Sequence, residues 1–494
     1  MTRRSLLVLL LGAGLLSSQP LPEHGKRYAR LVVRNAIVVE GNGTPASGPR
    51  DILIENNRIT RVVTSGYGNL PKPDAEIDAK GKYVLPGFIN MHGHSHDERA
   101  GAPLPIEYVF KLWLACGITT VRDVGSEFTK SRASRQASAE GSVIAPRLFL
   151  YPFFGRPATP ELARERVRQL KQQGADGIKI VGIHRDTMDA MMEEARALNL
   201  PVAHHVGVEE TNAWDNIRNR TTTIEHWYGI PDAALPLGQQ NFPPEFNYAD
   251  EVHRFRYAGR LWREADPQRL RKVLEEMVKA NVAWDPTLNI YEASRDLQRA
   301  ENKPEFQEYL HPSLDRFFRP SRTNHGSYFF GWTTADEVYW KENYRIWMNA
   351  LLDFAKLGGT VTTGEDAGYI YQVYGFGYLR ELELQQEAGF HPLTVVKHAT
   401  FNGAKMLGQE RTLGRVRENW TADLIIVNGN PLENFKILSP LGTADWDASG
   451  NPKRSGGIEY TVKDGFVYHV PKLAGEIREI VRKAKGRAPT PTAP

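Results

Sequence analysis

Residues 84–94 read Val-Leu-Pro-Gly-Phe-Ile-Asn-Met-His-Gly-His, so an apolar run leads directly into two histidines separated by one residue. Side chains two positions apart point to the same face of an extended strand, so His92 and His94 are expected to aim at one point. In a parallel barrel this pair would lie at the C-terminal end of a strand, where barrel enzymes carry their chemistry. Taken alone, the pair fits a metal site and a pair of surface histidines in a glycine-rich turn equally well.

The middle of the chain alternates short apolar runs with amphipathic helical segments, which is typical of parallel strands joined by helical crossovers. Eight runs are predicted to be strands: 83–94, 118–124, 147–151, 177–181, 202–206, 222–226, 282–288 and 361–365. Eight is the number that a closed (β/α)8 barrel of the TIM type needs. The predicted class is therefore α/β, with the barrel over 84–410. Two long connections, 228–281 and 289–359, are predicted to be insertions into this barrel.

Both ends of the chain read differently from the middle. Residues 28–83 and 411–472 contain short strand-like runs separated by turn residues such as Gly-Asn-Gly at 41–43, a pattern that indicates antiparallel hairpins. Chain ends often lie close together on a domain surface, so the two parts are expected to join in one small β domain. Residues 473–494 are predicted to form a terminal helix and a disordered, proline-rich tail.

Composition excludes several classes of protein. The 494 residues are 41% hydrophobic and 24% charged, as in ordinary soluble globular proteins. A net charge of +4 is too small to favour a nucleic-acid partner. Cys116 is the single cysteine and lies in an apolar run, so it is predicted to be a small buried hydrophobic side chain.

Residues 1–22 are predicted to be a secretory signal peptide. Arg3 and Arg4 precede a short apolar segment at 6–16, which is too short for a comfortable membrane span. Small residues follow without a clear cleavage motif, so an uncleaved N-terminal anchor is the alternative. The expected location is periplasmic or secreted, with no stable membrane association once the signal is removed.

Lys179 lies inside the apolar run Gly-Ile-Lys-Ile-Val at 177–181. A lysine in a buried strand must reach a partner or lose its charge, because desolvation disfavours the ammonium form. A neutral amine can combine with carbon dioxide to give a carbamate, an anion whose two oxygens can bridge two cations. The alternative is a lysine that extends out of the strand end into solvent.

Further histidines end the next two runs. His204 and His205 are adjacent and face opposite sides of a strand, so at most one of them is expected to face a metal site. His226 ends the run 222–226, and Glu225 beside it is predicted to face away and to be structural.

An aspartate follows the last of the predicted strands. In 361–368, alternation places Thr362, Gly364 and Asp366 on one face, so the Asp366 carboxylate is expected to join the histidines.

Taken in this order, the motifs resemble the amidohydrolase superfamily, and within it the branch of imidazolonepropionase-like proteins and carboxylated-lysine prolidases. The resemblance runs from about residue 28 to about residue 470 and implies that the chain ends form a composite β-sandwich. It also implies two divalent metal ions, with Zn²⁺ the expected metal, bridged by carboxylated Lys179. The implied metal ligands are His92, His94, Lys179, His205, His226 and Asp366, with His204 in place of His205 if the register slips. Glu365 stands where the family pattern usually has threonine.

The chemistry follows from this set of ligands. Histidine nitrogens and carboxylate oxygens suit zinc, and manganese or cobalt would also fit. Metal coordination lowers the pKa of a bound water from 15.7 to about 7, which gives hydroxide near neutral pH. Asp366 would act as the general base and acid, and Tyr228 is placed to donate to an oxyanion or a substrate carboxylate. Arg122 or Asp123 would support the ligands or bind substrate, and a structural ion pair explains them equally well.

The sequence thus predicts a metal-dependent hydrolase that cleaves an amide or peptide bond in a dipeptide or an N-acyl amino acid. The alternatives are a cyclic amidase or lactonase with the same binuclear site and a non-catalytic binding protein on the same fold. The expected partner is a small molecule, without nucleic acid, and a homo-oligomer is compatible with the sequence. Most of the aromatic residues in 289–359 are predicted to be helical core, and some to roof an aromatic substrate pocket.

Overall fold

A computed structural model describes residues 21–207, 211–237, 243–247 and 250–487. The signal peptide predicted at 1–22 therefore lies, except for its last two residues, outside the described residues, and so does the tail at 488–494. Among the described residues, none of the helices combines the length and the apolar character that a membrane span requires.

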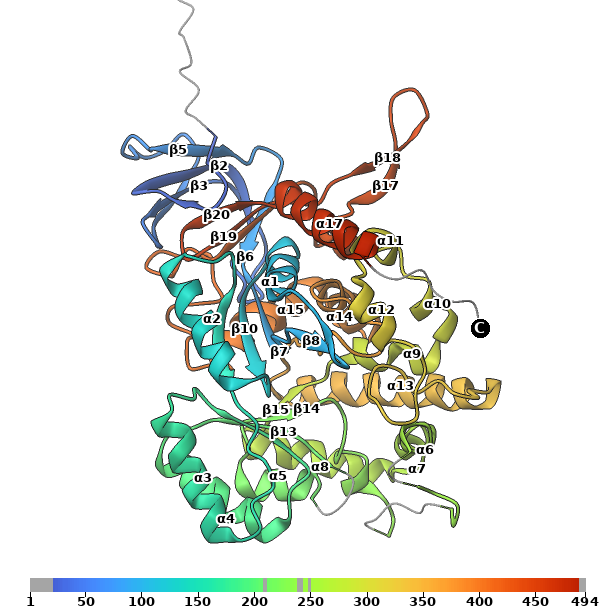
Figure 1. Cartoon of the computed structure of the whole chain (residues 1–494). Helices are drawn as coiled ribbons and strands as arrows, with labels where there is room; N and C mark the ends of the chain where they lie inside the picture. The colour runs from blue at the N-terminus through green and yellow to red at the C-terminus, as the bar shows by residue number, and fades with distance from the viewer. Residues whose placement is uncertain (1–20, 208–210, 238–242, 248–249, 488–494) are drawn as a thin grey trace, which may run out of the picture.

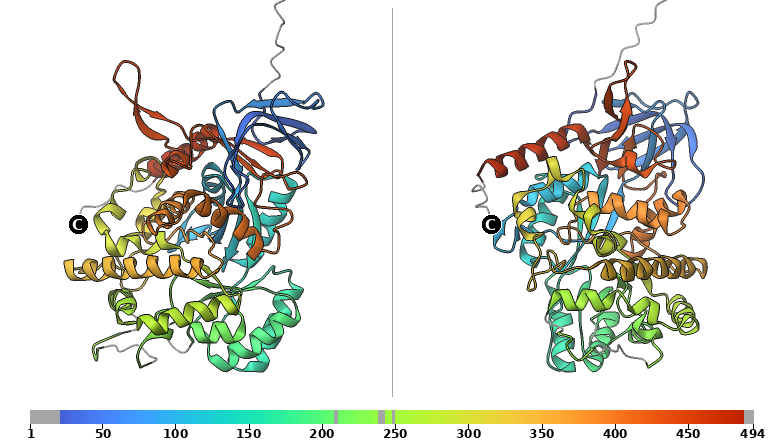
Figure 2. Two further views of the ribbon diagram at one scale, coloured as in Figure 1. Left: turned by 180° about the vertical axis from the view of Figure 1, so that it is seen from behind. Right: turned by 90° about the vertical axis from the view of Figure 1, so that its right-hand side faces the viewer.

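Strands from both ends of the chain form one nine-stranded sheet, in the order β1-β20-β19-β16-β6-β2-β3-β4, with β5 paired to β2. The N-terminal members are β1 (Lys26–Arg27), β2 (Arg30–Val38), β3 (Ser47–Glu55), β4 (Arg58–Thr64), β5 (Ala75–Asp78) and β6 (Tyr83–Pro86), and the C-terminal members are β16 (Leu424–Val427), β19 (Ile458–Lys463) and β20 (Phe466–His469). Val33, Ile52, Val84, Ile426 and Val462, which come from five of these strands, pack in one hydrophobic core. The sheet therefore curls around its own core, and the blue and red strands lie together in Figures 1 and 2.

Parallel strands make up the middle of the molecule, so the chain is mixed α/β as predicted. They are β7 (Phe88–Gly93), β10 (Ile118–Val124), β11 (Arg147–Tyr151), β12 (Ile178–Val181), β13 (Val202–His205), β14 (Thr223–Glu225) and β15 (Ala283–Asp285). They pair as two parallel sheets, in the orders β11-β10-β7 and β12-β13-β14-β15. Seven of the eight predicted runs therefore contain a parallel strand.

Backbone contacts connect the two sheets at both edges. A parallel bridge joins Phe153 to Lys179, and another joins Trp284 to Val361. Beyond Val361, the Asp366 N–H donates to the carbonyl of His92 at 2.8 Å. The segment 361–366 therefore lies beside β7 and fills the position of the eighth strand, although only Val361 makes a bridge there.

Helices cover the outside of the parallel strands: α1 (Ile106–Ala115), α2 (Phe128–Glu140), α3 (Pro160–Gln172), α4 (Arg185–Ala197), α5 (Ala213–Asn219), α8 (Pro267–Lys279), α14 (Phe376–Glu387), α15 (Pro392–Lys397), the π-helical turn η3 (His398–Asn402) and α16 (Gly403–Met406). Their beginnings follow local chemistry. Thr159 caps α3 by accepting from the Leu162 N–H at 3.3 Å, with Pro160 at the first helical position. Asn212 and Asp215 form a capping box at α5.

The two predicted insertions are largely helical. The first contains η1 (Asp232–Ala234), α6 (Glu251–Ala258), α7 (Leu261–Glu264) and α8, and the second contains η2 (Leu288–Tyr291), α9 (Glu292–Arg295), α10 (Leu297–Glu301), α11 (Phe306–Tyr309), α12 (Pro312–Phe317) and α13 (Thr334–Lys356). On α13, Tyr344, Trp347 and Leu351 are buried at helical spacing. Most of the aromatic side chains are thus core, whereas Phe330 is 51% exposed.

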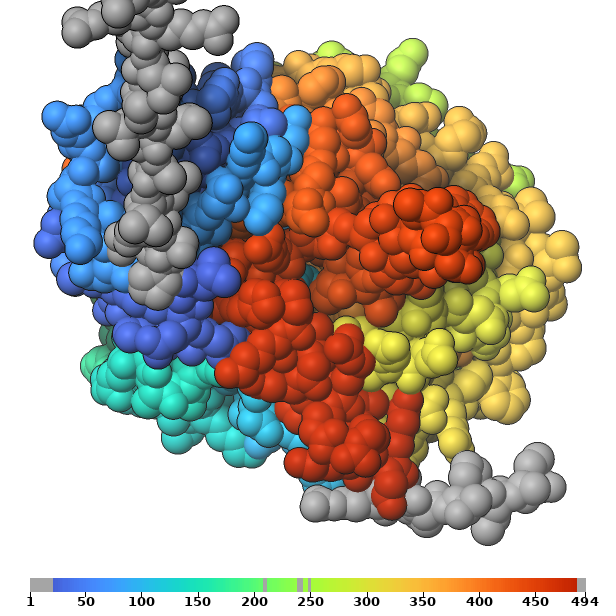
Figure 3. Space-filling model, turned by 90° about the horizontal axis from the view of Figure 1, so that it is seen from above, coloured from blue at the N-terminus to red at the C-terminus, as the bar shows by residue number. Residues whose placement is uncertain are grey.

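The remaining elements lie around this body. They are the short hairpin β8 (Glu98–Arg99) and β9 (Ala102–Pro103), η4 (Phe435–Leu438), the hairpin β17 (Thr443–Trp446) and β18 (Pro452–Ser455), and the terminal helix α17 (Val470–Arg487). The β17–β18 hairpin projects from the molecule in Figure 1, and α17 packs against α1. Seen from above in Figure 3, the blue N-terminal and red C-terminal surfaces lie side by side. Cys116 is buried, as predicted.

Candidate metal centre

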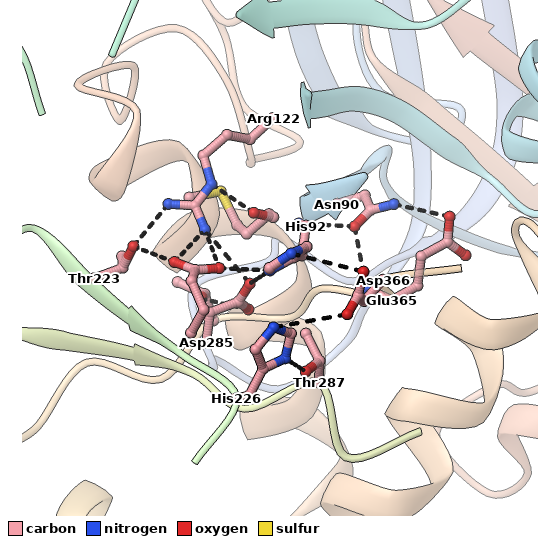
Figure 4. A network of polar contacts seen from close by, with 12 residues as sticks. Asn90, His92, Arg122, Thr223, His226, Asp285, Thr287, Glu365 and Asp366 are labelled. Carbon is pink, nitrogen blue, oxygen red and sulfur yellow. Dashed lines mark hydrogen bonds and ion pairs between the residues drawn. The ribbon is translucent and has the colours of Figure 1, made fainter. Parts of the chain in front are cut away.

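The end of β7 brings His92 and His94 beside Asp366. His94 Nε2 lies 2.9 Å from Asp366 Oδ1, and His92 Nε2 lies 3.7 Å from the same oxygen. These three side chains form a group that could hold a metal ion. Figure 4 shows His92 and Asp366 facing one another. His92 and His94 are therefore not surface residues, because His92 is 1% exposed and His94 is 6% exposed.

Asp366 is positioned by the close approach of two backbones. An ideal Cβ at Gly364 would lie 2.6 Å from His92 Cβ, so only glycine allows this segment to pass so near β7. Asp366 itself has φ +47°, a left-handed conformation that non-glycine residues rarely adopt. Backbone strain of this kind is concentrated at functional sites.

Lys179 on β12 points into the same site. Its Nζ lies 3.2 Å from His92 Nε2, and the residue is only 2% exposed, which rules out a side chain that extends into solvent. Among the described residues, no carboxylate oxygen lies within 4.0 Å of Nζ. Burial lowers the pKa of Lys179 to about 8, although the charge of Glu225 opposes this shift.

The strand register decides between the two adjacent histidines. Lys179 is paired with Ala203, so Ala203 and His205, two residues later, face the site, whereas His204 faces the opposite side. The His204 Nδ1 lies 2.8 Å from Asn216 Oδ1 on α5. The ring of His205 lies 4.7 Å from the ring of His226. The structure thus brings His205 to the candidate site.

His226 follows β14 and turns into the site through an unusual backbone conformation. Its φ is +59°, and its Nε2 lies 3.6 Å from Asp366 Oδ2. The Nδ1 atom makes a short contact with the Thr287 hydroxyl. The buried Nε2 atom has no hydrogen-bond partner among the described residues, so it is available as a metal ligand.

Glu225 corrects one prediction, because it does not face away from the site. Thr223 pairs with Ala203, and Glu225 lies two residues further along the strand, so the Glu225 side chain enters the same interior. Its Oε2 accepts a hydrogen bond from His92 Nδ1 at 2.6 Å. Strand alternation fails at the next residue because β14 ends at Glu225 and His226 adopts the left-handed conformation. Both adjacent side chains therefore reach the centre.

Arg122 is tied to the histidine ligands through Glu225. Its Nη2 donates to both Glu225 oxygens at 2.8 Å, and its Nη1 donates to Thr223 Oγ1 at 2.8 Å (Figure 4). Burial alone would raise the pKa of Glu225, but the Arg122 and Lys179 charges hold it below its ordinary value. Glu225 is therefore an ionised acceptor, which leaves the hydrogen of His92 on Nδ1 and its Nε2 lone pair facing the centre.

Asp123 has a different role from its neighbour. Its carboxylate accepts hydrogen bonds from the Ser131 hydroxyl at 2.7 Å and from the Ser95 N–H at 3.3 Å. Asp123 thus fixes the loop that begins directly after His94 and does not contact a histidine ligand through these bonds.

Asp285, at the end of β15, is a further carboxylate of the centre that the sequence argument missed. It pairs with Glu225 in register, and its Oδ2 lies 3.8 Å from His92 Nδ1. Burial and the nearby Glu225 charge raise the pKa of Asp285 to about 8. An aspartate inside the predicted strand 282–288 was the signal available for this residue.

Glu365, which departs from the family pattern, points away from the metal ligands. It accepts from Asn90 Nδ2 at 3.0 Å and from the Gly375 N–H at 2.7 Å, and it contacts the Trp113 indole. Burial raises its pKa to about 8. Glu365 therefore fixes the loop after Asp366 to β7 and α1.

Tyr228 lies over two of the candidate ligands. Its ring is 5.0 Å from that of His205 and 6.1 Å from that of His226. Tyr291, from the second insertion, packs at right angles to it at 5.9 Å. These contacts place the Tyr228 ring between two candidate ligands and an aromatic residue of the insertion.

The chemistry of these side chains fits divalent cations. Burial lowers the pKa values of His92, His205 and His226 well below their ordinary value, so all three imidazoles are neutral, which is the form that binds metal. Nitrogens of His92 and His94 meet the Asp366 carboxylate at one point, and within the described part of the chain the Nε2 of His226 has no hydrogen-bond partner. A zinc ion would satisfy this set of nitrogen and oxygen donors.

A family model and several curated proteins are similar to parts of this chain. The model of the amidohydrolase family matches residues 83–236 and 348–465. A dihydroorotase of Aquifex aeolicus (strain VF5) is 37% identical over 93 residues, which are 19% of this chain and 21% of that protein. A dihydroorotase of Syntrophotalea carbinolica is 31% identical over 164 residues, 31% of this chain and 37% of that protein. The chain thus matches only about a fifth to just over a third of the length of these curated relatives.

Solved structures resemble the chain over most of its length. A Xaa-Pro dipeptidase with methionine bound in its active site aligns with a TM-score of 0.61 and 19% identity, over 89% of this chain and 100% of that chain. Molinate hydrolase aligns with a TM-score of 0.63 and 14% identity, over 95% and 99% of the two chains. At these identities the likeness shows the fold alone. The family match covers more than half of the sequence, and the chain belongs to the amidohydrolase family.

Proposed function

We propose that the protein is a metal-dependent hydrolase that cleaves an amide or peptide bond. The observation that carries this proposal is the convergence of His92, His94 and Asp366 with Lys179 and His226 in one buried centre. The ring of parallel segments that presents these residues is, in this proposal, a (β/α)8 barrel with its chemistry at the carboxyl ends of the strands.

The proposed metal ligands are His92, His94, Lys179, His205, His226 and Asp366, and the proposed metals are two Zn²⁺ ions. Lys179 is proposed to be carboxylated and to bridge them. Three observations support this modification: the lysine is buried, no described carboxylate oxygen lies within 4.0 Å of its Nζ, and its lowered pKa favours the neutral amine that attacks carbon dioxide.

When bound, divalent metal ions would lower the pKa of water at the site and polarise a carbonyl. Asp366 faces His92, His94 and His226, and its carboxylate is proposed to accept a proton from the attacking water and to deliver it to the leaving nitrogen. Tyr228 is proposed to donate to the oxygen that becomes negatively charged. Glu225 and Arg122 hold the His92 ring in the tautomer that binds metal.

The proposed substrate is a dipeptide or an N-acyl amino acid. The matches to dihydroorotases favour one second candidate, a cyclic amidase or lactonase that uses the same centre. Residues 1–22 support a further proposal, that the protein is exported to the periplasm or beyond. Fractionation of the native producing cells tests that proposal, because an exported protein is absent from the cytosol.

Product analysis tests the function directly. Zinc-loaded protein is incubated with a panel of dipeptides, N-acyl amino acids, cyclic imides and lactones, and products are identified by mass spectrometry against a chelator-treated control. Metal-dependent cleavage of linear amides is expected. Cleavage of rings alone would favour the second candidate. Absence of cleavage by protein that binds no metal would favour a binding protein on the same fold.

A further inference from the structure

Arg99 is a buried cation that lacks a carboxylate partner among the described residues. It is 5% exposed, and no described Asp or Glu oxygen lies within 4.0 Å of its guanidinium nitrogens. Arg122, which is also buried, is paired with Glu225 at 2.8 Å. Buried charges in proteins are normally paired, because removing a charge from water without compensation is costly. Arg99 therefore departs from the usual pattern.

The contacts that hold Arg99 do not neutralise its charge. Its Nη2 donates to the Tyr374 hydroxyl at 2.7 Å. Its guanidinium carbon lies 4.5 Å from the centre of the Tyr369 ring and 5.5 Å from that of Phe317. The buried Nε atom has no hydrogen-bond partner in the described structure. Such a group is oriented and desolvated, and it has an N–H donor to spare for an anion.

The position of Arg99 links it to the candidate metal centre. It lies in β8, a few residues after His94, while Tyr369 lies in the segment that follows Asp366. Both segments leave the carboxyl ends of parallel strands, which is the face that carries the centre. The Tyr369 ring lies 5.5 Å from the His94 ring and 4.5 Å from the Arg99 guanidinium carbon, so a single aromatic ring separates the cation from a candidate ligand.

The backbone after Asp366 is shaped around the guanidinium. An ideal Cβ at Gly368 would lie 2.3 Å from Arg99 Nη2 and 2.3 Å from the Tyr374 hydroxyl. Gly368 has φ +87°, and Ile370, a β-branched residue, has φ +42°. Strained backbone of this kind persists where the surrounding structure demands it. The segment that carries the candidate catalytic carboxylate thus also encloses Arg99.

We propose that Arg99 binds the carboxylate of the substrate while the scissile amide lies at the metal centre. This inference rests on the proposed function and narrows it to linear substrates that carry a carboxylate one residue from the scissile bond. One residue spans at most about 3.6 Å. An arginine–carboxylate hydrogen bond adds about 2.8 Å. These lengths together set how far an arginine nitrogen can lie from the scissile bond, and the Tyr369 ring, 5.5 Å from the His94 ring and 4.5 Å from the Arg99 guanidinium carbon, lies between the two groups.

Kinetics on matched pairs of compounds test the role of Arg99. Each pair contains an N-acetyl amino acid and the N-acetyl amine that lacks only its carboxylate, for glycine, leucine, phenylalanine and proline. With zinc-loaded wild-type protein, the pair that is cleaved best is expected to show a kcat/KM at least tenfold higher for the acid than for the amine. Most of this difference is expected to come from a lower KM for the acid. Arg99→Met is expected to abolish this preference, so that the acid and the amine of each pair have similar kcat/KM. Arg99→Lys is expected to retain part of the preference.

Lys130→Met is the matched control. Lys130, in α2, is 63% exposed and pairs with Asp97 at 2.6 Å, so this variant removes a cation that contacts the loop before Arg99 without touching Arg99. It is expected to keep the wild-type preference for the acid. A drop in that preference in Lys130→Met would mean that general electrostatic attraction, and not a site at Arg99, selects the acid, and would overturn the proposal.

Binding separates this inference from the proposed function. The same pairs are titrated into the zinc-loaded proteins by calorimetry, so a signal does not require turnover. Acids that bind wild-type protein but not Arg99→Met, without cleavage of any compound, would support the anion site and contradict the amidase activity. The proposal is overturned if wild-type protein prefers no acid in either assay. It is also overturned if Arg99→Met weakens acids and amines equally, because a purely structural clamp has that effect.

Discussion

Replacing Glu225 by glutamine should weaken metal binding without changing a single ligand. The substitution keeps the volume of the side chain but removes the charge that accepts the His92 Nδ1–H at 2.6 Å and pairs with Arg122 at 2.8 Å. Loss of a partner that orients a metal-binding histidine typically costs 10- to 100-fold in metal affinity. We therefore expect the Kd for zinc in Glu225→Gln to rise by about 10- to 100-fold.

The cost in folding stability can also be estimated. Breaking a buried ion pair by removing one partner costs about 3–5 kcal/mol. In this centre Asp285 Oδ2 lies 3.5 Å from Arg122 Nη2, and Asp285 is held neutral partly by the Glu225 charge. Once that charge is gone, Asp285 can ionise and pair with Arg122. We therefore expect a smaller loss, about 2 kcal/mol, in the free energy of unfolding.

The assays are zinc competition against a chromophoric chelator and urea denaturation of the metal-free protein. Glu292→Gln is the control, because Glu292 is a buried carboxylate that pairs with Arg380 at 2.6 Å and touches none of the candidate ligands. The control is expected to lose stability and to keep its zinc affinity. A zinc Kd for Glu225→Gln within twofold of wild type would refute the reasoning.

Three further predictions concern catalysis, metal content and pH. Asp366→Asn should retain much of its zinc and lose at least 100-fold in kcat, because it removes the proton acceptor; steady-state kinetics and metal analysis check this, and a fully active variant would contradict the assignment. Lys179→Ala should bind one metal fewer than wild type by mass spectrometry, and an unchanged stoichiometry would indicate a mononuclear site. Burial lowers the pKa of His398 to about 3, so only the unfolded chain gains its proton as the pH falls from about 6.5. The free energy of unfolding therefore falls as the pH decreases from about 6.5 toward 3, by up to about 1.4 kcal/mol per pH unit. Urea denaturation at several pH values measures this slope, and His398→Gln should flatten it.

Buried parallel strands were the most predictable part of the fold. The runs 118–124 and 147–151 have the bounds of β10 and β11, because a fully buried strand is apolar or tightly packed along its whole length. The run 361–365 was predicted less well. In this run Thr362 donates to Asp285 at 2.9 Å, Glu365 accepts from the Gly375 N–H of the neighbouring loop at 2.7 Å, and only Val361 makes a bridge.

The candidate site was predictable where strand alternation holds and unpredictable where it ends. Alternation left His204 and His205 undecided, and the register with Lys179 decides for His205. Alternation gave the wrong direction for Glu225, because nothing in the local sequence signals that His226 takes a left-handed conformation directly after the strand. Arg99 lies outside the eight runs predicted to be strands, and the lack of a carboxylate partner among the described residues is visible only from three-dimensional contacts.

Metal stoichiometry tests the central claim most directly. Chelator-treated wild-type protein is titrated with zinc, and the bound metal per chain is measured after gel filtration. The account predicts two zinc ions per chain in wild type and a loss of both affinity and activity in His92→Ala. Wild-type protein that binds no zinc, or His92→Ala protein that binds as much as wild type, would contradict it.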